Sequence, residues 1–151
     1  MIELELKVDA KEALGRVNRL GGKLPSIGIR KALDAAGAFA ASRLRKDFPK
    51  RTGRTAKTIG GGKVIKKGRG FSLPVGSSSF VARLIDVGVA AHRIEPLNVR
   101  ALRIPGVGFR ASAMHPGFRG RRIWDRVADR DAERVSTVFA TSLSRFVARF
   151  R

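Results

Sequence analysis

Both histidines of the chain, His92 and His115, lie in a segment that also contains several glycines and prolines. Imidazole is a common metal ligand and a common proton carrier near neutral pH, so the pair raises two kinds of chemistry. A zinc site needs three or four ligands. The chain has no cysteine, and the acids of this region are Asp86 and Glu95. Because these residues do not complete a ligand set, we predict neither a metal site nor a catalytic pair.

Two glycine-rich segments are the next candidates for chemistry. A phosphate-binding loop around Gly62-Lys63 needs a glycine at position 57 and a hydroxyl residue at position 64, where the chain has Lys57 and Val64. The segment Gly106-Val107-Gly108 lacks the third glycine of a dinucleotide-binding turn. The basic half of the chain has no acidic cluster to hold magnesium. We therefore expect a protein that is not an enzyme, with no cofactor and no small-molecule substrate.

The charge of the chain is strongly positive and unevenly distributed. Lysine and arginine number 32 against 12 acids, which gives a formal net charge of +20. Such a field attracts polyanions or acidic neighbours. The densest run of cations consists of Lys50, Arg51, Arg54, Lys57, Lys63, Lys66, Lys67 and Arg69.

Three interpretations of this basic run stay open. It could dock on acidic protein partners, it could contact the phosphate backbone of DNA without reading the base sequence, or it could serve only solubility. Aromatic residues are not interleaved with the cations and the chain has no tyrosine, so stacking on bases is poorly supported.

The hydrophobic pattern predicts the elements that position these residues. Residues 2–8 alternate as a half-buried strand, and a short helix follows from Asp9 to about Leu20, with Pro25 in the loop after it. A second helix is predicted from about 27 to 48, ended by Pro49. Residues 49–70 are predicted as a flexible basic loop with a weak strand at 63–66.

The second half of the pattern predicts strands and a long helix. Strands are expected at 71–75, 80–87 and 99–104, with a turn at Pro105-Gly106. A helix is expected from about Ile123 to Phe146 or beyond, with its acids and arginines paired on its surface. The sequence therefore predicts a single α+β domain over residues 1–151. Two or three helices, including a long C-terminal one, would pack on an antiparallel sheet.

The chain shows neither a membrane span nor a signal peptide by its pattern. No apolar run approaches the roughly 18 residues that a membrane span needs. The first residues alternate and carry acids, unlike a secretory leader. We expect no membrane partner, and the lack of cysteine fits a reducing compartment.

Four short segments follow one another in a fixed order along the chain. They are Asp47-Phe48-Pro49-Lys50-Arg51-Thr52-Gly53, then Phe80 and Ala82 with Asp86-Val87-Gly88, then His92-Arg93-Ile94-Glu95-Pro96 with Ala101-Leu102-Arg103-Ile104, and last His115-Pro116-Gly117. Together these segments resemble the neck or tail-completion proteins of long-tailed phages of the lambdoid type, in the order that this family keeps. Thr55, Val89 and Asp86 depart from the residues usual at their positions.

The resemblance implies a structural virion protein. Such a protein would form an oligomeric ring in the neck, at the junction of head and tail, after assembly in the host cytoplasm. Its partners would be further copies of itself, an adaptor or stopper protein, a tail terminator and, as a second option, the packaged DNA. The residues expected to shape loops or touch a neighbouring subunit are Thr52, Gly53, Asp86, Gly88, His92, Ile94, Pro96, His115, Pro116 and Gly117.

Overall fold

A computed structural model of the chain describes residues 2–5, 15, 17–50, 52–68 and 70–150. The chain divides into two compact units, where the sequence predicts a single domain. The first unit is formed by residues 1–83 with 123–151, and the second by residues 84–122. The strands of the second unit pair with one another and, among the described residues, with no strand of the first unit.

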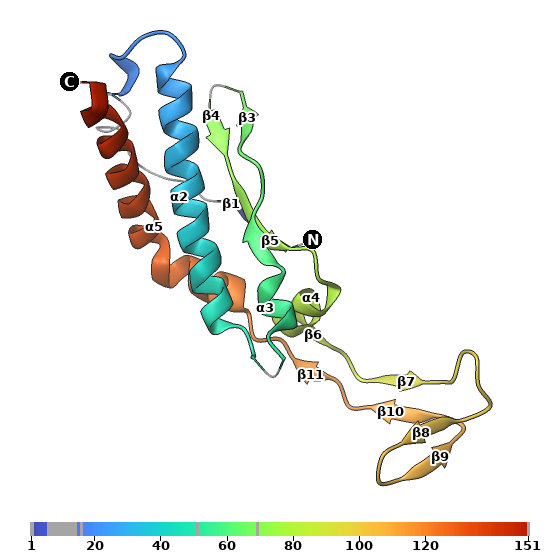
Figure 1. Cartoon of the computed structure of the whole chain (residues 1–151). Coiled ribbons are helices and arrows are strands. Elements are labelled where there is room, and N and C mark those ends of the chain that lie inside the picture. Colours follow the sequence, from blue (N-terminus) through green and yellow to red (C-terminus); the bar gives the residue numbers. More distant parts are fainter. Residues whose placement is uncertain (1, 6–14, 16, 51, 69, 151) are drawn as a thin grey trace. The chain divides into compact units, whose positions relative to one another are not determined.

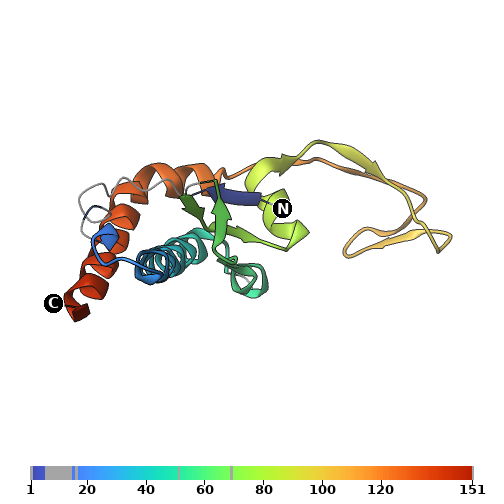
Figure 2. The same ribbon diagram turned by 90° about the horizontal axis from the view of Figure 1, so that it is seen from above.

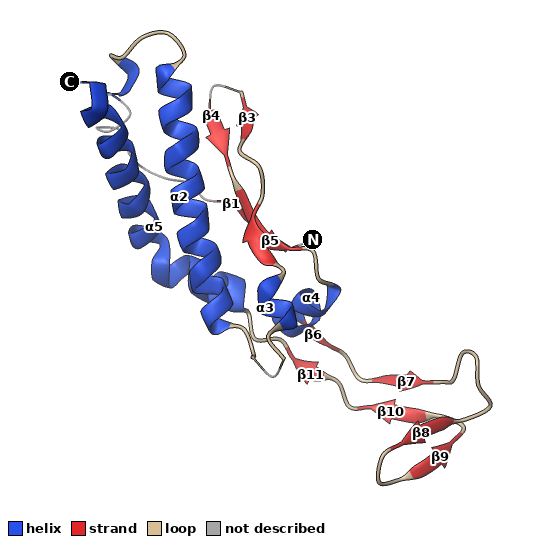
Figure 3. Cartoon of the chain, viewed as in Figure 1, coloured by secondary structure: helices blue, strands red, loops and turns tan. Residues whose placement is uncertain are grey.

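The first unit combines two long helices with short antiparallel strands, as the α+β prediction required (Figures 1 and 3). Its elements are β1 (Ile2–Glu5), α2 (Leu24–Asp47), α3 (Arg54–Lys57), β2 (Ile59–Gly61), β3 (Ile65–Lys67), β4 (Gly70–Ser72), β5 (Pro74–Ser77), the first half of α4 (Phe80–Val87), α5 (Ile123–Val147) and the 3-10 turn η1 (Ala148–Phe150).

The ends of α2 follow from two prolines. Pro25 lies in the first turn of the helix, and its predicted place in a preceding loop is wrong. The first turn suits proline, whose fixed φ fits a helix and whose missing N–H has no helical partner there. At the other end Phe48 is extended, with φ −73° and ψ 143°. The following Pro49 disfavours a helical conformation at Phe48, so the helix ends where the sequence predicts.

Helix α2 packs against α5 and against strands β2 and β5 (Figures 1 and 2). The residues that permit this on both faces are small. A Cβ added at Gly28 would lie 2.6 Å from the ring of Phe146 on α5. A Cβ added at Gly37 would overlap the side chain of Leu73, beside the sheet. Buried alanines, among them Ala32, complete the two contact faces.

The sheet beside α2 has three strands in the order β1-β5-β2, all antiparallel. In its register Leu4 pairs with Val75, and Gly61 pairs with Val75 from the other side. Ile59 and Val75 are buried against the helix layer. The strand predicted at 71–75 is divided between β4 and β5, and β4 pairs with β3 as a separate hairpin.

Helix α5 confirms the long C-terminal helix and most of its apolar stripe. It spans Ile123–Val147, and the 3-10 turn continues it to Phe150. The stripe residues that are buried are Val127, Val135, Phe139, Leu143 and Phe146. Near the N-terminal end of α5, the ring of Trp124 meets the ring of Phe48, the residue that follows α2, edge to face, with ring centroids 4.9 Å apart.

The second unit consists of the last half of α4 and three two-stranded antiparallel ladders. The pairs are β6 (Gly88–Val89) with β11 (Phe118–Arg119), β7 (His92–Ile94) with β10 (Ala113–His115), and β8 (Leu102–Ile104) with β9 (Gly108–Arg110). The predicted turn is present. The Val107 N–H donates to the carbonyl of Ile104, and Gly106 has φ +77°, as a type II turn after Pro105 requires.

The strand predicted at residues 80–87 is wrong, because these residues form helix α4. Their β-branched and aromatic residues favoured a strand. Burial follows a helical period instead, since Ala82 and Asp86 are buried and lie one turn apart. The Ala82 N–H donates to the carbonyl of Ser79 at the start of the helix. The strand predicted at 99–104 is shortened to β8.

Two other predictions have mixed outcomes. The segment 49–70, expected as a loop, contains α3, β2 and β3, and the weak strand expected at 63–66 falls at Ile65–Lys67. Strand β1 covers the first part of the predicted strand 2–8. The rest of that strand and the start of the helix expected from Asp9 lie outside the described residues, while Val17 and Asn18 are helical.

The packing of α2 predicts an unusual effect for Gly37→Ala. Alanine in place of glycine normally stabilises a helix interior by about 0.5–1 kcal/mol. At Gly37 the new methyl group would meet Leu73, which is buried and has little room to move. We expect the free energy of unfolding in urea to fall by about 1–3 kcal/mol instead.

Leu73→Ala supplies the control for Gly37→Ala. Alone it leaves a cavity and should cost about 2–5 kcal/mol. In the double variant the new methyl group occupies part of that cavity, so the combined cost should be clearly smaller than the sum of the two single costs. Costs that simply add would show that α2 does not approach the sheet at Gly37.

Candidate functional site

The two histidines of the second unit face each other across a strand pair. His92 in β7 and His115 in β10 are direct partners in the register. Their rings are stacked, with centroids 5.0 Å apart and an angle of 23° between the planes. This contact is not predictable from local sequence patterns, because the residues that bring the two strands together are spread over both segments.

The hydrogen bonds of the two rings leave too few free nitrogen lone pairs to bind a shared metal ion. The Gly117 N–H donates to Nδ1 of His115, over 3.0 Å. The neutral ring of His115 therefore carries its proton on Nε2, which leaves no lone pair there. Nδ1 of His92 lies 3.0 Å from the carbonyl oxygen of Ala90 and must be the donor. The pair thus offers one free lone pair, on Nε2 of His92.

The other possible ligands are also lacking around this pair. Within the described residues, no group of three or more histidines and acids lies close enough to hold a metal ion. Glu95 is exposed and pairs with Arg93 at 3.0 Å. The arrangement fits a pair of aromatic rings that joins two strands and fixes the turn at Gly117.

Glycines let the two chain segments of the second unit approach closely. Gly88 has φ +93° and Gly117 has φ +75°. A Cβ on Gly117 would lie 2.5 Å from the carbonyl oxygen of Val89, and a Cβ on Gly120 would overlap the backbone at Val87. Residues larger than glycine therefore do not fit at these positions.

Backbone hydrogen bonds extend this close approach beyond the strands. The N–H groups of Arg121 and Arg122 donate to the carbonyl oxygens of Ile85 and Asp86, each over 3.0 Å. Residues 88–94 and 113–119 thus form one antiparallel pair of segments, which the two hydrogen bonds extend to the last turn of α4; we call this pair the ribbon. The glycines in Asp86-Val87-Gly88 and His115-Pro116-Gly117 lie where its two segments are closest.

The second unit has almost no interior of its own. All of residues 84–122 are described, and no hydrophobic side chain among them is buried, whereas Asp86 is. Pro96 is half-buried and Pro116 is exposed. The large apolar side chains that this unit exposes are Val87, Ile94, Leu97, Val99, Val107, Phe109, Met114 and Phe118.

Arginines accompany the apolar side chains on the paired strands. Arg103 is the cross-strand partner of Phe109, and Arg93 is the partner of Met114. Phe109 and Met114 each have 68% of their surface exposed. Aromatic residues, methionine and arginine are the types enriched in protein–protein interfaces. The surface of the second unit therefore contains residue types that are common in protein–protein interfaces.

The predicted basic run is divided between two places in the first unit. Lys50, Arg54 and Lys57 lie at the C-terminal end of α2 and on α3. Lys63, Lys66 and Lys67 lie before and within β3, whose hairpin with β4 is at the opposite end of the strands from α3 (Figure 1). Arg51 and Arg69 lie outside the described residues. The cations therefore do not form one continuous loop.

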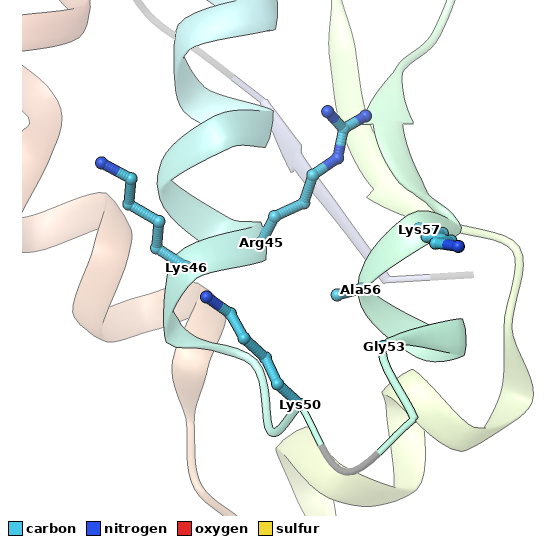
Figure 4. A pocket seen from close by; sticks show the side chains of 6 residues that line it. All are labelled: Arg45, Lys46, Lys50, Gly53, Ala56 and Lys57. Carbon is cyan, nitrogen blue, oxygen red and sulfur yellow. The ribbon is translucent and has the colours of Figure 1, made fainter.

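A pocket of about 400 Å³ lies between the end of α2 and α3 (Figure 4). We call it the basic pocket. Thr52 is exposed, and Gly53 has φ +67° and begins α3. This glycine turn brings α3 back toward α2 and so forms one side of the pocket. The residues that line the pocket are Arg45, Lys46, Lys50, Gly53, Ala56 and Lys57.

Two of these lining cations were missed at the level of sequence. Arg45 and Lys46 lie in the last turn of α2. Arg45 is held in place because its Nε and Nη2 donate to the carbonyl oxygen of Ile59, over 2.9 and 2.6 Å. The signal available in the sequence was the pair Arg45 and Lys46 just before the predicted end of the helix at Phe48. Without the glycine turn, however, nothing linked this pair to the cations of α3.

A buried carboxylate joins the two long helices. Asp131 on α5 is 1% exposed, so its predicted place on the helix surface is wrong, whereas its pairing with the neighbouring Arg130 and Arg134 is confirmed. Arg43 of α2 donates to its Oδ2 over 3.2 Å, and Arg130 donates to the same atom over 2.8 Å. Arg130 also donates to Asp47 of α2 over 2.9 Å. The signal was present here too, because Asp131 continues the four-residue steps of the buried stripe.

The surroundings of Asp131 keep it charged. Burial raises the pKa of the carboxyl group, but the hydrogen bonds from Arg130 and Arg43 outweigh burial and lower the pKa below its ordinary value. The same contacts, first with Asp47 and then with Asp131, raise the pKa of Arg130. A carboxyl group with a lowered pKa is a poor proton carrier at neutral pH, so this cluster is suited to holding helices together.

None of the helices in the described part of the chain is both long enough and apolar enough to cross a membrane. Comparison of the chain with protein-family models, curated proteins and solved structures finds no match.

The lowered pKa of Asp131 predicts a component of stability that disappears in acid. Because the folded state binds this proton less readily than the unfolded state, the stabilisation is complete above the unfolded pKa of about 3.9. It is lost as the pH falls through the lower pKa of the folded protein. Asp131→Asn removes the charge, and we expect it to cost about 1–3 kcal/mol at pH 7 in urea unfolding.

The difference in stability between Asp131→Asn and the parent should begin to narrow below about pH 4, where the unfolded parent binds the proton, and should close as the folded parent is protonated at still lower pH. Asp129→Asn is the matched control, since Asp129 is on the same helix and exposed. Its effect should stay within about 0.5 kcal/mol. A gap that does not change with pH would contradict a charged Asp131.

The glycine contacts of the ribbon predict a large effect for Gly117→Ala. The substitution adds a methyl group where the backbone of the facing segment lies, at a positive φ. We expect the amide hydrogens of β6, β7, β10 and β11 to lose protection in hydrogen exchange. Gly106→Ala has a similar φ, but no described atom lies within 4 Å of its Cβ position. It should cost about 1–2 kcal/mol at most and leave that protection in place. Equal losses in both variants would contradict the close approach.

Proposed function

We propose that this chain is a structural protein of a tailed-bacteriophage virion, which forms an oligomeric ring in the neck at the head-to-tail junction. One observation carries the proposal. The second unit, residues 84–122, exposes large apolar side chains and buries none of its own. A unit of this size is too small to be stable through a core, and association with other chains is a common remedy. The resemblance of four segments to neck and tail-completion proteins supports the neck of a phage particle as the place where the chain assembles.

The surface of the second unit supports contacts between subunits. Apolar side chains on a monomer are usually scattered, whereas a gathering of them marks an interaction site. Phe109 and Met114 stand on different ladders, each opposite an arginine. The rigid turns at Gly106 and Gly117 give these strands defined paths. In a ring, each copy would place this unit against its neighbour, and the adaptor or stopper and the tail terminator would contact the ring above and below.

The proposal predicts that substitution of Phe109 weakens self-association. Phe109→Ser should raise the dissociation constant of the oligomer by at least about tenfold, because a buried aromatic residue is often a dominant contact. Ile65→Ser is the control, since Ile65 is also exposed but lies in β3 of the first unit. Sedimentation velocity over a range of concentrations measures both. Equal dissociation constants for the two variants would contradict a role of the second unit in the interface between subunits.

Virion assembly without this chain tests the proposed place in the particle. When the gene is inactivated in the phage that encodes it, filled heads and finished tails should accumulate separately in electron micrographs. Supplying the parent chain should restore joining, and supplying Phe109→Ser should restore it less. Joined and infectious particles made in the absence of the chain would contradict the proposal.

A further inference from the structure

The basic pocket has the composition of a site for anions. Four of its six lining residues are cations, and none is an acid. Lys46, Lys50 and Lys57 are exposed and form no ion pair with another described residue. The nearest acid in sequence, Asp47, is already occupied by Arg130. The positive charge of the pocket is therefore not neutralised by the part of the chain that the structure describes.

The form of these cations favours contacts with separate point charges over two-pronged recognition of one anion. Two-pronged recognition of a single carboxylate or phosphate uses the guanidinium of arginine. The guanidinium of Arg45 donates from both Nε and Nη2 to the carbonyl of Ile59, so this group is engaged with the main chain. The remaining cations are lysines, which act as point charges on flexible stems.

The arrangement of the lysines fits a row of separate anions. Figure 4 shows the side chains of Lys46 and Lys57 directed away from the space between α2 and α3, to opposite sides, with Lys50 along the end of α2, so the ammonium groups do not converge on one centre. Arg54 adds a further exposed cation on α3. A nucleic acid presents phosphates at regular intervals, and each one that a lysine neutralises releases condensed counterions. An acidic protein surface has no comparable layer of condensed ions to release.

We infer that the basic pocket binds the phosphate backbone of DNA, through Lys46, Lys50 and Lys57. The contact is independent of base sequence, because lysines that neutralise phosphates do not read the edges of the bases. The inference concerns the first unit and does not rest on ring assembly in a phage neck. In a ring of such chains, however, DNA bound at each pocket would offset the repulsion among copies that each carry a net charge of +20.

The test measures binding of a fluorescein-labelled DNA duplex of about 20 base pairs by anisotropy, at several salt concentrations. The pocket variant combines Lys46→Gln, Lys50→Gln and Lys57→Gln. The control variant combines Lys23→Gln, Lys63→Gln and Lys66→Gln, which removes the same charge from exposed lysines outside the pocket. All six positions are exposed, so both variants should fold, which circular dichroism and thermal melting check.

We expect the parent to bind with an affinity that falls steeply with salt. The pocket variant should bind at least about tenfold more weakly at 0.1 M salt, and the slope of log K against log salt should fall by about 2–3, near 0.9 for each phosphate that is no longer neutralised. The affinity of the control variant should fall by less than about threefold. Equal losses of affinity in both variants would mean diffuse attraction and would overturn the site, as would a parent that does not bind at 0.1 M salt.

Competition separates DNA from an acidic protein partner. Polyglutamate at the same concentration of charge should displace the labelled duplex poorly, and unlabelled duplex should displace it fully. If polyglutamate displaces the duplex from the parent as well as unlabelled DNA does, the pocket recognises carboxylates and the inference is wrong. Ring assembly can fail in the association experiment while this binding persists, so the two proposals are tested separately.

Discussion

The close packing of α2 between α5 and the sheet is the constraint on which the first unit depends. A helix can approach the layers on its two sides this closely only if its side chains facing those layers are small. In α2, Gly28 meets Phe146 on one side and Gly37 meets Leu73 on the other. The small residues bring the layers near, and the large side chains that fill the gaps come from α5 and the strands. A glycine in a helix costs about 0.5–1 kcal/mol relative to alanine, and burial of these larger side chains offsets that cost.

Charge has two distinct roles around this packed layer. At one end of the interface, Arg43 and Arg130 surround Asp131, and the carboxylate remains ionised although it is buried. This cluster uses cations to join helices, and it satisfies groups that would otherwise be costly to bury. A few residues further along α2, the cations Arg45 and Lys46 face the basic pocket, where the lining includes no acid. Toward its C-terminal end, α2 thus changes from Arg43, which is paired with a carboxylate, to Arg45 and Lys46, which form no ion pair with another residue that the structure describes.

How much was predictable from the sequence differs between elements for physical reasons. The end of α2 at Phe48 and the course of α5 were predicted, because proline geometry and a long apolar period act locally. Helix α4 was missed, because eight residues rich in apolar side chains do not separate a period of two from a period of 3.6. The fold decides between them when it buries Ala82 and Asp86 on one side.

The parts of the candidate sites that were missed depend on contacts between distant segments. His92 and His115 were singled out as residues, but their stacking requires the ribbon to form first. The pocket required Gly53 to turn α3 toward the end of α2. The burial of Asp131 was readable in principle, since it continues the steps of Val127 and Val135. The residue type argued against burial of Asp131, because an aspartate is seldom buried unless it is paired.

The ribbon has a consequence for how such a protein can change over evolutionary time. Its two segments are joined by main-chain hydrogen bonds and by backbone contacts at Gly88, Gly117 and Gly120. None of residues 95–112 is buried, so we expect this stretch to tolerate substitution and changes of length better than the glycines do. Recognition of a new neighbour then requires only local substitutions at this tip, while the glycines that hold its base stay the same.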